Sequence, residues 1–540
     1  MTVQGAGGTG KSFIINMIRT IMMSMFPNLG TFIVSAPVGV AAYNIKGFTC
    51  HKAFSVNVND PASPLPFSKE NALKKLLQNV LLLIIDERSM LSMDVLGAIE
   101  TNCRKCAFNG HNSSKDFGSI PIILLFGDDH QLPPVQKFGK GYGTDMIFTD
   151  TMQMDTRLNP IQRLGRHCFL LLSKNVVTLT KVRRVDDDAK ELLDICENIR
   201  NNGGVTEEQS ILLKKLHLCS GYVSSKRIDF LKQNAMWVYP TNEQVDNHNF
   251  ESLKKLVSSN NPVIQIGSKM TVLESSSRSV PARSHFDKDL LKKVNVSLCR
   301  GCKVSIDRNI CETIGLFNGA TGTVNEIRFK TDESPLKGDL PEYILMDLDT
   351  YTGKQWHPKS PSLVPIYACN VICNYHCCKL TYFPMSLAFA RTIHKVQGKE
   401  FGSRFKGQPA LVADIGLRQL EGKFPGITYT VISRVSSTGN GNVDESALYF
   451  CGDTLEEDRF TDLLHKKTNK SNTGKQLYDK IEKRLRWILY IQRRSNETHI
   501  EITSEQKQQI RLWIESTIYH LDELQNIISN YCYNSSPSLE

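Results

Sequence analysis

The sequence predicts an α/β fold built on parallel β-sheets, with a small β-barrel inserted in it and a helical C-terminal tail. Three observations support this prediction. Residues 5–12 read Gly-Ala-Gly-Gly-Thr-Gly-Lys-Ser, which matches the phosphate-binding pattern G-x-x-x-x-G-K-[S/T]. Apolar runs alternate with helix-like segments over residues 1–178, as a parallel sheet with helices on its faces requires. Acidic or amide side chains follow two of these runs, where parallel sheets bind their ligands.

The glycine-rich segment is the first element of the predicted fold. Its glycines allow a tight turn, so that backbone N–H groups can cradle phosphate oxygens at the N-terminus of the next helix. Lys11 is predicted to reach the β- and γ-phosphates of a nucleoside triphosphate, and the hydroxyl of Ser12 to bind Mg²⁺. The residues predicted to contact the nucleotide here are Gly5, Gly7, Gly8, Thr9, Gly10, Lys11 and Ser12.

A β-strand should precede the glycine-rich segment, but only residues 1–4 are available for it. A typical strand has about five or six residues. Three explanations are open at this point: the natural start lies upstream, the chain is a fragment, or the first strand is short.

Three further apolar runs are predicted to be buried strands of the same sheet, namely residues 31–35, 80–85 and 120–126. Asp86 and Glu87 follow the second run. We expect Asp86 to bind Mg²⁺ and Glu87 to orient and deprotonate an attacking water. The alternative is a pair of acids that caps a helix. Gln131 follows the third run, at the predicted lip of the sheet, and is expected to sense the γ-phosphate.

The remaining segments suggest further domains. The proline-rich stretch at about 56–70 is expected to leave the first domain, because proline does not fit a core strand or helix. A second α/β signal begins near residue 237 and returns at residues 411–414 and 429–432. Between its halves, Asn-Gly and Gly turns separate short strands, as in a small β-barrel. The predicted boundaries are 1–178 for the first domain, 179–261 and 381–454 for the second, 262–380 for the insertion, and 455–540 for a helical, partly basic extension.

The composition is that of a globular protein with several domains. A length of 540 residues suits about three or four domains, and the net charge of +10 permits a polyanionic partner without requiring one. The basic residues of the extension are interpreted mainly as a solvated helix face. No apolar run is long enough to span a membrane, and no signal peptide is legible. We therefore expect an intracellular protein of the nucleus, with the mitochondrion as the alternative.

The fifteen cysteines are interpreted as reduced thiols and small core residues. A zinc site needs four convergent ligands, and spacing alone is weak evidence for one. The groupings that stand out are Cys103/Cys106, Cys299/Cys302, and the cluster Cys369, Cys373, His376, Cys377 and Cys378.

An ordered series of segments between residue 5 and about residue 436 resembles the superfamily-1 helicases that move 5′→3′, the PIF (petite integration frequency) and RecD branch. These segments also resemble the helicases of Helitron mobile elements. Besides the phosphate-binding, Asp86-Glu87 and Gln131 segments, the matching segments are residues 36–42, 47–54, 179–184, 390–400 and 429–435. Residues 392–398, Thr-Ile-His-Lys-Val-Gln-Gly, are close to a signature of that branch.

The resemblance implies two RecA-like domains, an SH3-like barrel at 262–380 and a wedge at about 56–70 that parts the duplex. It implies hydrolysis of ATP with Mg²⁺, coupled to movement on single-stranded DNA and unwinding of forked DNA. DNA repair, recombination or telomere maintenance are the expected settings.

The resemblance also assigns roles to residues of this chain. The two arginine fingers of the family fall on Arg184 and Arg434, which would reach the nucleotide from the second domain and make hydrolysis sensitive to domain closure. Further nucleotide contacts fall on Gln397, Gly398 and Glu400. Contacts with single-stranded DNA, through charge and stacking, fall on Pro37, His51, His394 and Lys395.

Several positions depart from the family pattern and leave nucleotide choice and affinity open. No glutamine element precedes the phosphate-binding segment; Val38 and Val182 stand where Thr and Asn are usual, and Arg88 where a small or apolar residue is usual. Two alternatives remain. One is an RNA helicase of the other superfamily-1 branch. The sequences of residues 392–398 and 432–435 argue against it. The other is a truncated, catalytically impaired Helitron-type remnant that only binds nucleic acid, although the catalytic residues are intact.

Overall fold

The structure is a computed structural model of the chain. It describes residues 1–27, 30–58, 60–106, 115–134, 158–182, 190–273, 283–331, 333–358, 360–373, 375–403, 407–417, 419–453, 459–461, 463, 486–498 and 508.

The first sheet has six strands in the order β3-β2-β4-β5-β1-β6, and all of its strand pairs are parallel. Its strands are β1 (Thr2–Gly5), β2 (Phe32–Ala36), β3 (Phe48–Thr49), β4 (Leu82–Ile85), β5 (Ile122–Gly127) and β6 (Val176–Leu179). The helices of this region are α1 (Lys11–Met25), α2 (Gly39–Asn44), α3 (Cys50–Ala53), α4 (Phe67–Leu77), α5 (Met93–Cys106) and α6 (Pro160–Leu172), with 3₁₀ turns η1 (Arg88–Met90) and η2 (Asp116–Ser119). The four residues of β1 form a strand that pairs with β5 on one side and β6 on the other.

Strand β4 shows why an uninterrupted apolar run belongs in this sheet. Its alternate residues face opposite sides, because side chains alternate along a strand. Leu83 and Ile85 pack into a core that includes residues of α5 and α6, whereas Leu82 and Ile84 pack into a core with residues of α1 and α2. Both faces are therefore covered, and the carboxyl edge of the sheet is left for binding.

The second sheet has four parallel strands in the order β18-β7-β19-β20. Its strands are β7 (Met236–Tyr239), β18 (Ala390–Thr392), β19 (Leu411–Ala413) and β20 (Leu448–Phe450). The helices of this region are α7 (Lys190–Asn202), α8 (Glu207–Lys215), α9 (Ser225–Asn234), α10 (Asn242–Lys254), α12 (Gln419–Lys423) and α13 (Ile427–Ile432), with η6 (Ile393–Val396) and η7 (Val443–Glu445). The parallel-sheet prediction is confirmed for both regions. Residues 429–432, which the sequence grouped with the sheet signals, lie in helix α13 instead.

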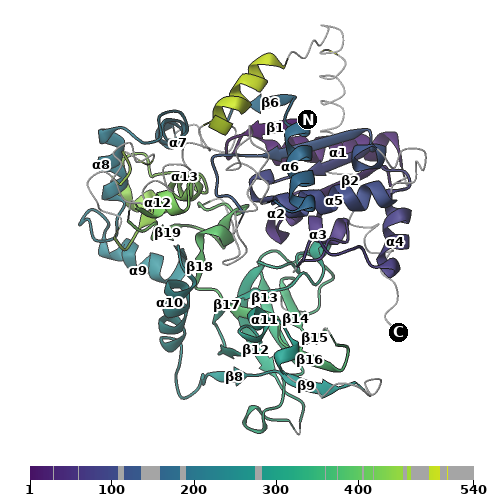
Figure 1. The fold of residues 1–540 in the computed structure, drawn as a ribbon. Helices are drawn as coiled ribbons and strands as arrows, with labels where there is room; N and C mark the ends of the chain where they lie inside the picture. Colours follow the sequence, from purple (N-terminus) through teal and green to yellow (C-terminus); the bar gives the residue numbers. More distant parts are fainter. Residues whose placement is uncertain are drawn as a thin grey trace.

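The chain between β7 and β18 leaves the second sheet and forms antiparallel sheets, which lie below both parallel sheets in Figure 1. The strands are β8 (Ile264–Ile266), β9 (Lys269–Val272), β10 (Val296–Leu298), β11 (Lys303–Ile306), β12 (Thr321–Arg328), β13 (Tyr343–Leu348), β14 (Leu363–Ile366), β15 (Cys369–Ile372), β16 (Cys378–Tyr382) and β17 (Met385–Leu387), with α11 (Lys288–Leu291), η3 (Arg283–His285), η4 (Glu312–Ile314) and η5 (Pro335–Lys337). The largest of these sheets has the order β14-β13-β12-β11-β17. The SH3-like barrel stays a prediction, because within the described residues no pairing joins β14 to β17.

Part of the C-terminal extension is helical and lies against the first sheet. The helix of residues 486–497, yellow in Figure 1, lies beside β6. Trp487 and Ile491 are buried in the same core as α5 and α6, and the backbone N–H of Val176 in β6 donates to Oγ1 of Thr498 at 3.1 Å. This segment therefore continues the core of the first region rather than projecting from it.

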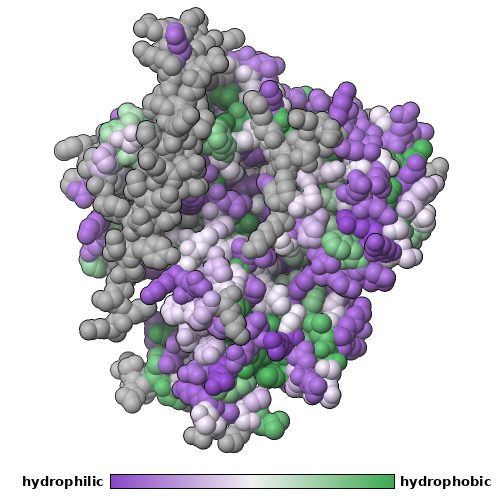
Figure 2. All heavy atoms as spheres, turned by 180° about the vertical axis from the view of Figure 1, so that it is seen from behind, coloured by the Kyte–Doolittle hydropathy of each residue, from purple (hydrophilic) through white to green (hydrophobic). Residues whose placement is uncertain are grey.

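The surface of the described residues mixes polar and apolar side chains. Figure 2 shows hydrophilic and hydrophobic patches interspersed on the back of the molecule. No helix in the described part of the chain has the length and hydrophobicity that crossing a membrane requires.

Candidate nucleotide-binding and catalytic site

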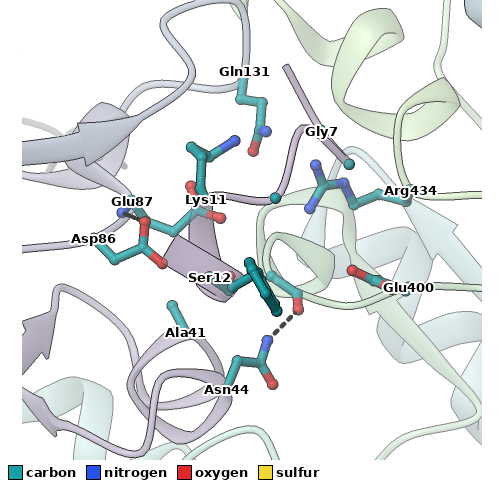
Figure 3. A pocket seen from close by; sticks show the side chains of 14 residues that line it. Gly7, Lys11, Ser12, Ala41, Asn44, Asp86, Glu87, Gln131, Glu400 and Arg434 are labelled. Atoms are coloured by element: carbon teal, nitrogen blue, oxygen red, sulfur yellow. Dashed lines mark hydrogen bonds between the residues drawn. The ribbon is translucent and has the colours of Figure 1, made fainter. Parts of the chain in front are cut away.

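A pocket of about 370 Å³ lies at the carboxyl edge of the first sheet, where the second sheet region faces it (Figure 3). Most of its lining was predicted from the sequence, and the two regions contribute to it from opposite sides. The lining residues are Gly7, Gly8, Gly10, Lys11, Ser12, Phe13, Ala41, Asn44, Asp86, Glu87, Gln131, Gly398, Glu400 and Arg434.

The loop between β1 and α1 has the backbone of an anion-binding site. Gly8 and Gly10 adopt positive φ angles of 86° and 88°, which glycine tolerates and other residues rarely do. No side chain caps the N-terminus of α1, so the first N–H groups of the helix are available to an anion. The Oγ1 of Thr9 closes the loop by donating to the carbonyl of Ala6 at 2.9 Å.

Lys11 lies folded over this loop. Its Nζ donates to the carbonyl oxygens of Gly5 at 2.7 Å and Ala6 at 2.9 Å. These are neutral acceptors, and a phosphate oxygen would make a stronger, charge-assisted bond with the same ammonium. Gly5 thus takes part through its carbonyl rather than by lining the pocket.

The two acids predicted to be catalytic are buried at the end of β4 and line the pocket. Burial and, next to it, the charge of the neighbouring Glu87 together raise the pKa of Asp86 to about 7, against the opposing effect of Lys11. Glu87 has a positive φ of 50°, unusual for a residue other than glycine. Within the described residues its Oε2 is buried without a hydrogen-bond partner. Such an arrangement is costly in the protein alone and suits a bound cation or water.

Gln131 lies in the turn that follows β5, and this turn is attached to the second region. The backbone N–H of Leu132 donates to Oγ1 of Thr430 at 2.9 Å, and Nε2 of Gln397 donates to the carbonyl of Leu132 at 3.1 Å. Gln397 therefore holds the turn that carries Gln131, and it does not itself line the pocket. A movement between the two regions would displace Gln131 from the nucleotide side of the site.

Arg434 and Glu400 reach the pocket from the second region, and Arg434 points toward the glycine-rich loop in Figure 3. The side chain of Arg434 is buried. Among the described residues, its guanidinium donates to Oγ of Ser433 at 3.4 Å and its Nε has no hydrogen-bond partner. Gly398 joins the two regions directly, because its carbonyl accepts from Nδ2 of Asn44 at 2.7 Å.

Arg88, which departs from the family pattern, does not line the pocket. It is fully buried and forms an ion pair with Asp129 through two hydrogen bonds, while Nη2 also donates to Oε1 of Gln4 at 2.9 Å. Nε1 of Trp487 donates to the same carboxylate of Asp129 at 2.8 Å. Arg88 directly follows the two predicted catalytic acids in the sequence, but its contacts hold the fold together and do not reach the pocket.

The predicted DNA contacts lie apart from the pocket lining. Pro37 follows β2, His51 lies on the short helix α3, and His394 and Lys395 lie on η6 after β18. Lys395 is exposed. Burial lowers the pKa of His394 to about 4, so this ring is neutral near neutral pH. His394 packs edge-on against Phe424. It can contribute stacking or a neutral hydrogen bond, and not a positive charge.

Sequence reasoning did not identify some residues that complete the site. Phe13 and Asn44 line the pocket; Phe13 follows the phosphate-binding pattern directly, and its 57% exposure distinguishes it from a core residue. Tyr429 donates to Oδ2 of Asp128 at 2.7 Å across the two regions. Burial alone would raise the pKa of Asp128. The hydrogen bond with His130 and the charge of Arg200 outweigh burial and hold this pKa well below its usual value. No sequence spacing signals this contact, since it joins residues about 300 positions apart.

The predicted finger Arg184 lies outside the described residues.

The residues present fit Mg²⁺. Asp86 and Ser12 both line the pocket and offer the oxygen ligands that Mg²⁺ prefers. The raised pKa of Asp86 and the buried, unbonded Oε2 of Glu87 show a local shortage of positive charge that a divalent cation would supply.

Comparisons with known proteins identify similar helicases. Residues 1–204 match the family model of PIF1-like helicases. The ATP-dependent DNA helicase Pif1 of Campylobacter jejuni is 23% identical over 416 residues, which cover 73% of this chain and 80% of that protein. The helicase PIF7 of Trypanosoma brucei brucei is 25% identical over 435 residues, which cover 73% of this chain and only 40% of that protein.

A solved structure of Pif1 helicase from Bacteroides, in complex with ADP-AlF3 and single-stranded DNA, superposes with a TM-score of 0.55. It is 21% identical and the match covers 85% of this chain and 90% of that one. The likeness confirms the predicted fold class of RecA-like parallel-sheet domains.

Proposed function

We propose that the chain is a PIF1-like helicase, as its match to that family model and its similarity to Pif1 helicases support, and that it uses the pocket between its two parallel sheets to hydrolyse ATP. Hydrolysis would drive movement along single-stranded DNA in the 5′→3′ direction and unwinding of the duplex at forks. The observation that carries the proposal is that Arg434, from the second region, faces the loop of Lys11 and the acids Asp86 and Glu87 in one pocket.

Phosphoryl transfer depends on positioning and on neutralising charge, and the lining residues supply both. Lys11 and the N–H groups of residues 7–12 would hold the phosphates, while Ser12 and Asp86 would hold Mg²⁺, which neutralises phosphate charge when it is bound. Glu87 would orient the attacking water and accept its proton. Arg434 would stabilise charge that develops on the γ-phosphate. Arg184 is proposed as a second finger, and Gly398 and Glu400 as further nucleotide contacts.

Coupling of hydrolysis to movement would arise because the site is divided between two bodies. Gln131 belongs to the first region but its turn is hydrogen-bonded to Thr430 and Gln397 of the second. If the two regions separate, Arg434 leaves the pocket and the turn of Gln131 loses its support. Hydrolysis would then occur only in the closed state, which DNA bound across both regions would favour.

We propose that DNA lies on Pro37, His51, His394 and Lys395, and that the segment at about 56–70, which ends in the first turn of α4, acts as a wedge. Its base is anchored in the core by Val56 and Leu65, while Val58 and Phe67 expose apolar side chains that would contact the opened base pair. The domain boundaries predicted from the sequence, and roles in repair, recombination or telomere maintenance, belong to this proposal.

The test is ATP hydrolysis by the purified chain with and without single-stranded DNA, for the wild type, Lys11→Ala and the exposed-lysine control Lys174→Ala. We expect hydrolysis that DNA stimulates, a loss of at least about 10²-fold in Lys11→Ala, and wild-type rates in the control. Unwinding of forked substrates with a single 5′ or 3′ tail then tests the direction. DNA binding without hydrolysis in the wild type would overturn the proposal and favour the remnant hypothesis.

A further inference from the structure

A cluster of sulfur and nitrogen atoms lies in the antiparallel region, among β9, β15, β16 and η3, away from the nucleotide pocket (Figure 1). Its members are His285, Cys373, Cys377 and Cys378, and their potential ligand atoms all lie within 4.8 Å of one another. Sγ of Cys377 lies 3.4 Å from Sγ of Cys373, 3.7 Å from Sγ of Cys378 and 3.3 Å from Nδ1 of His285.

These separations are close to those of a tetrahedral zinc site. With Zn–S bonds of about 2.3 Å and Zn–N bonds of about 2.0–2.1 Å, a tetrahedron places two sulfurs about 3.8 Å apart, and a sulfur and a nitrogen about 3.6 Å apart. The observed sulfur pairs are much farther apart than the roughly 2.05 Å of a disulfide. Three cysteines and one histidine are also an established ligand set for structural zinc.

The backbone explains how three cysteines converge within six positions. Strands β15 and β16 form a hairpin whose turn is closed by the N–H of Cys373 donating to the carbonyl of Cys378 at 3.0 Å. His376 adopts a positive φ of 55° in this turn, and the N–H of Cys377 donates to Sγ of Cys373 at 3.4 Å. The turn thus brings the three thiols within 4.8 Å of one another.

The fourth member comes from a distant segment, which is why spacing did not reveal it. His285 ends the 3₁₀ turn η3, about 90 positions before the cysteines, and its ring packs against Tyr375. Of the cluster noted in the sequence, Cys369 and His376 are not members of this group.

The surroundings indicate a structural role. Cys373, Cys377 and Cys378 are buried and form part of a small core with Phe286, Val294, Leu380 and Tyr382. So small a core buries little apolar surface, and small folded units of this kind often rely on a metal or a disulfide.

We propose that His285, Cys373, Cys377 and Cys378 bind one Zn²⁺ in a closed structural site, which fastens residues 283–291 to the β15–β16 hairpin. Four protein ligands leave no position for water or substrate, so the ion stabilises this part of the insertion and takes no part in ATP hydrolysis. Binding converts the three thiols to thiolates and releases their protons to solvent.

The experiment is metal analysis of the full-length chain, purified without a polyhistidine tag, by inductively coupled plasma mass spectrometry. We expect about one zinc per chain. His285→Ala and Cys373→Ser should each lower the zinc content at least tenfold. Cys369→Ser is the matched control, because it removes a thiol from the same hairpin that is not part of the group, and it should keep its zinc.

A second measurement on the wild type remains informative if the variants misfold. After removal of zinc, addition of Co²⁺ should produce the visible absorption of tetrahedral cobalt with thiolate-to-cobalt charge transfer. Wild-type protein that contains no zinc and gives no such absorption would overturn the proposal, as would zinc that persists in both ligand variants. A disulfide between any two of these cysteines, detected by mass spectrometry of unreduced peptides, would also overturn it. These outcomes do not depend on whether the chain hydrolyses ATP.

Discussion

Two buried clusters of charged residues lie side by side at the carboxyl edge of the first sheet, and they differ in how their charges are compensated. In the first cluster, Arg88 is paired with Asp129, which also accepts a hydrogen bond from Trp487. In the second, Glu87 and Arg434 line the nucleotide pocket, and within the described residues Oε2 of the one and Nε of the other are buried without hydrogen-bond partners.

The difference separates structural charges from functional ones. Removing a charge from water is costly. The ion pair of Arg88 and Asp129 offsets part of that cost inside the protein, although within the described residues Nη1 of Arg88 is buried without a hydrogen-bond partner. Within the described residues Oε2 of Glu87 and Nε of Arg434 have no hydrogen-bond partner, and a nucleotide with its cation would offer partners to both. A protein that keeps such a pocket is therefore less stable when empty than it would be with neutral side chains, and gains catalysis in return.

The largest effect is expected from Arg434→Ala. Loss of an arginine finger lowers kcat by about 10³-fold or more in related phosphoryl transfer. Because this arginine has few partners in the protein, its removal should leave the free energy of unfolding nearly unchanged. The measurements are steady-state ATPase kinetics with DNA and chemical denaturation, with the exposed Arg328→Ala as the control. A fall in kcat of less than tenfold, or a large loss in the free energy of unfolding, would show that Arg434 has a structural role, as Arg88 and Asp129 do.

The opposite pattern is expected from Asp129→Asn in the paired cluster. The substitution leaves Arg88 buried with an uncompensated charge, which should lower the free energy of unfolding by about 3–5 kcal/mol. The measurement is urea denaturation followed by circular dichroism. Asp229→Asn, which disturbs an exposed pair with Lys232, should change stability by less than about 0.5 kcal/mol. Equal losses in the two variants would show that the buried pair contributes no more to the free energy of unfolding than an exposed pair does.

Asp86→Asn extends the comparison, because it removes a buried carboxylate from the nucleotide pocket. The pKa of Asp86 is about 7 in the folded chain against an ordinary 3.8, so the folded chain binds the extra proton between these pH values. The contribution of Asp86 to the free energy of unfolding therefore falls as the pH rises from about 4 to 7. Asparagine does not titrate and avoids this loss.

We therefore expect Asp86→Asn to be more stable than the wild type at pH 8, by on the order of 2 kcal/mol, and to lose ATPase activity. The gain should vanish near pH 4. Urea denaturation at both pH values in the absence of nucleotide measures it. A variant that is less stable than the wild type at pH 8 would mean that the carboxylate of Asp86 is compensated in the empty protein.

The nucleotide pocket could be predicted from the sequence, whereas the cluster of Arg88, Asp129 and Trp487 could not. Lys11 and Ser12 end a glycine-rich pattern, and Asp86 and Glu87 directly follow an apolar strand; both local patterns indicate position and chemistry. Gln131 was predicted from its position after the third apolar run, and Arg434 from the order of segments that resemble a family. All of these line the pocket.

Asp129 and Trp487 illustrate what local patterns cannot predict. They are 358 positions apart, and only the packing of the C-terminal helix on β6 and α6 brings them together. Arg88 could be seen to depart from the family pattern, but its partner could not be named. The proposed zinc ligands are a second example. Three of them are close in sequence, but the fourth comes from a distant segment that no local pattern indicates.

The smallest effect is expected from Trp487→Phe, which isolates one hydrogen bond of the paired cluster. Phenylalanine keeps the aromatic stack on Phe169, whose ring centroid lies 4.9 Å away, but cannot donate to Asp129. The free energy of unfolding should fall by about 1–2 kcal/mol, since the lost bond is to a charged acceptor. Trp237→Phe is the matched control: within the described residues Nε1 of Trp237 is buried without a partner, so removing it should cost less than Trp487→Phe. Equal losses measured by urea denaturation would show that ring volume, and not the bond to Asp129, couples the C-terminal helix to the catalytic edge.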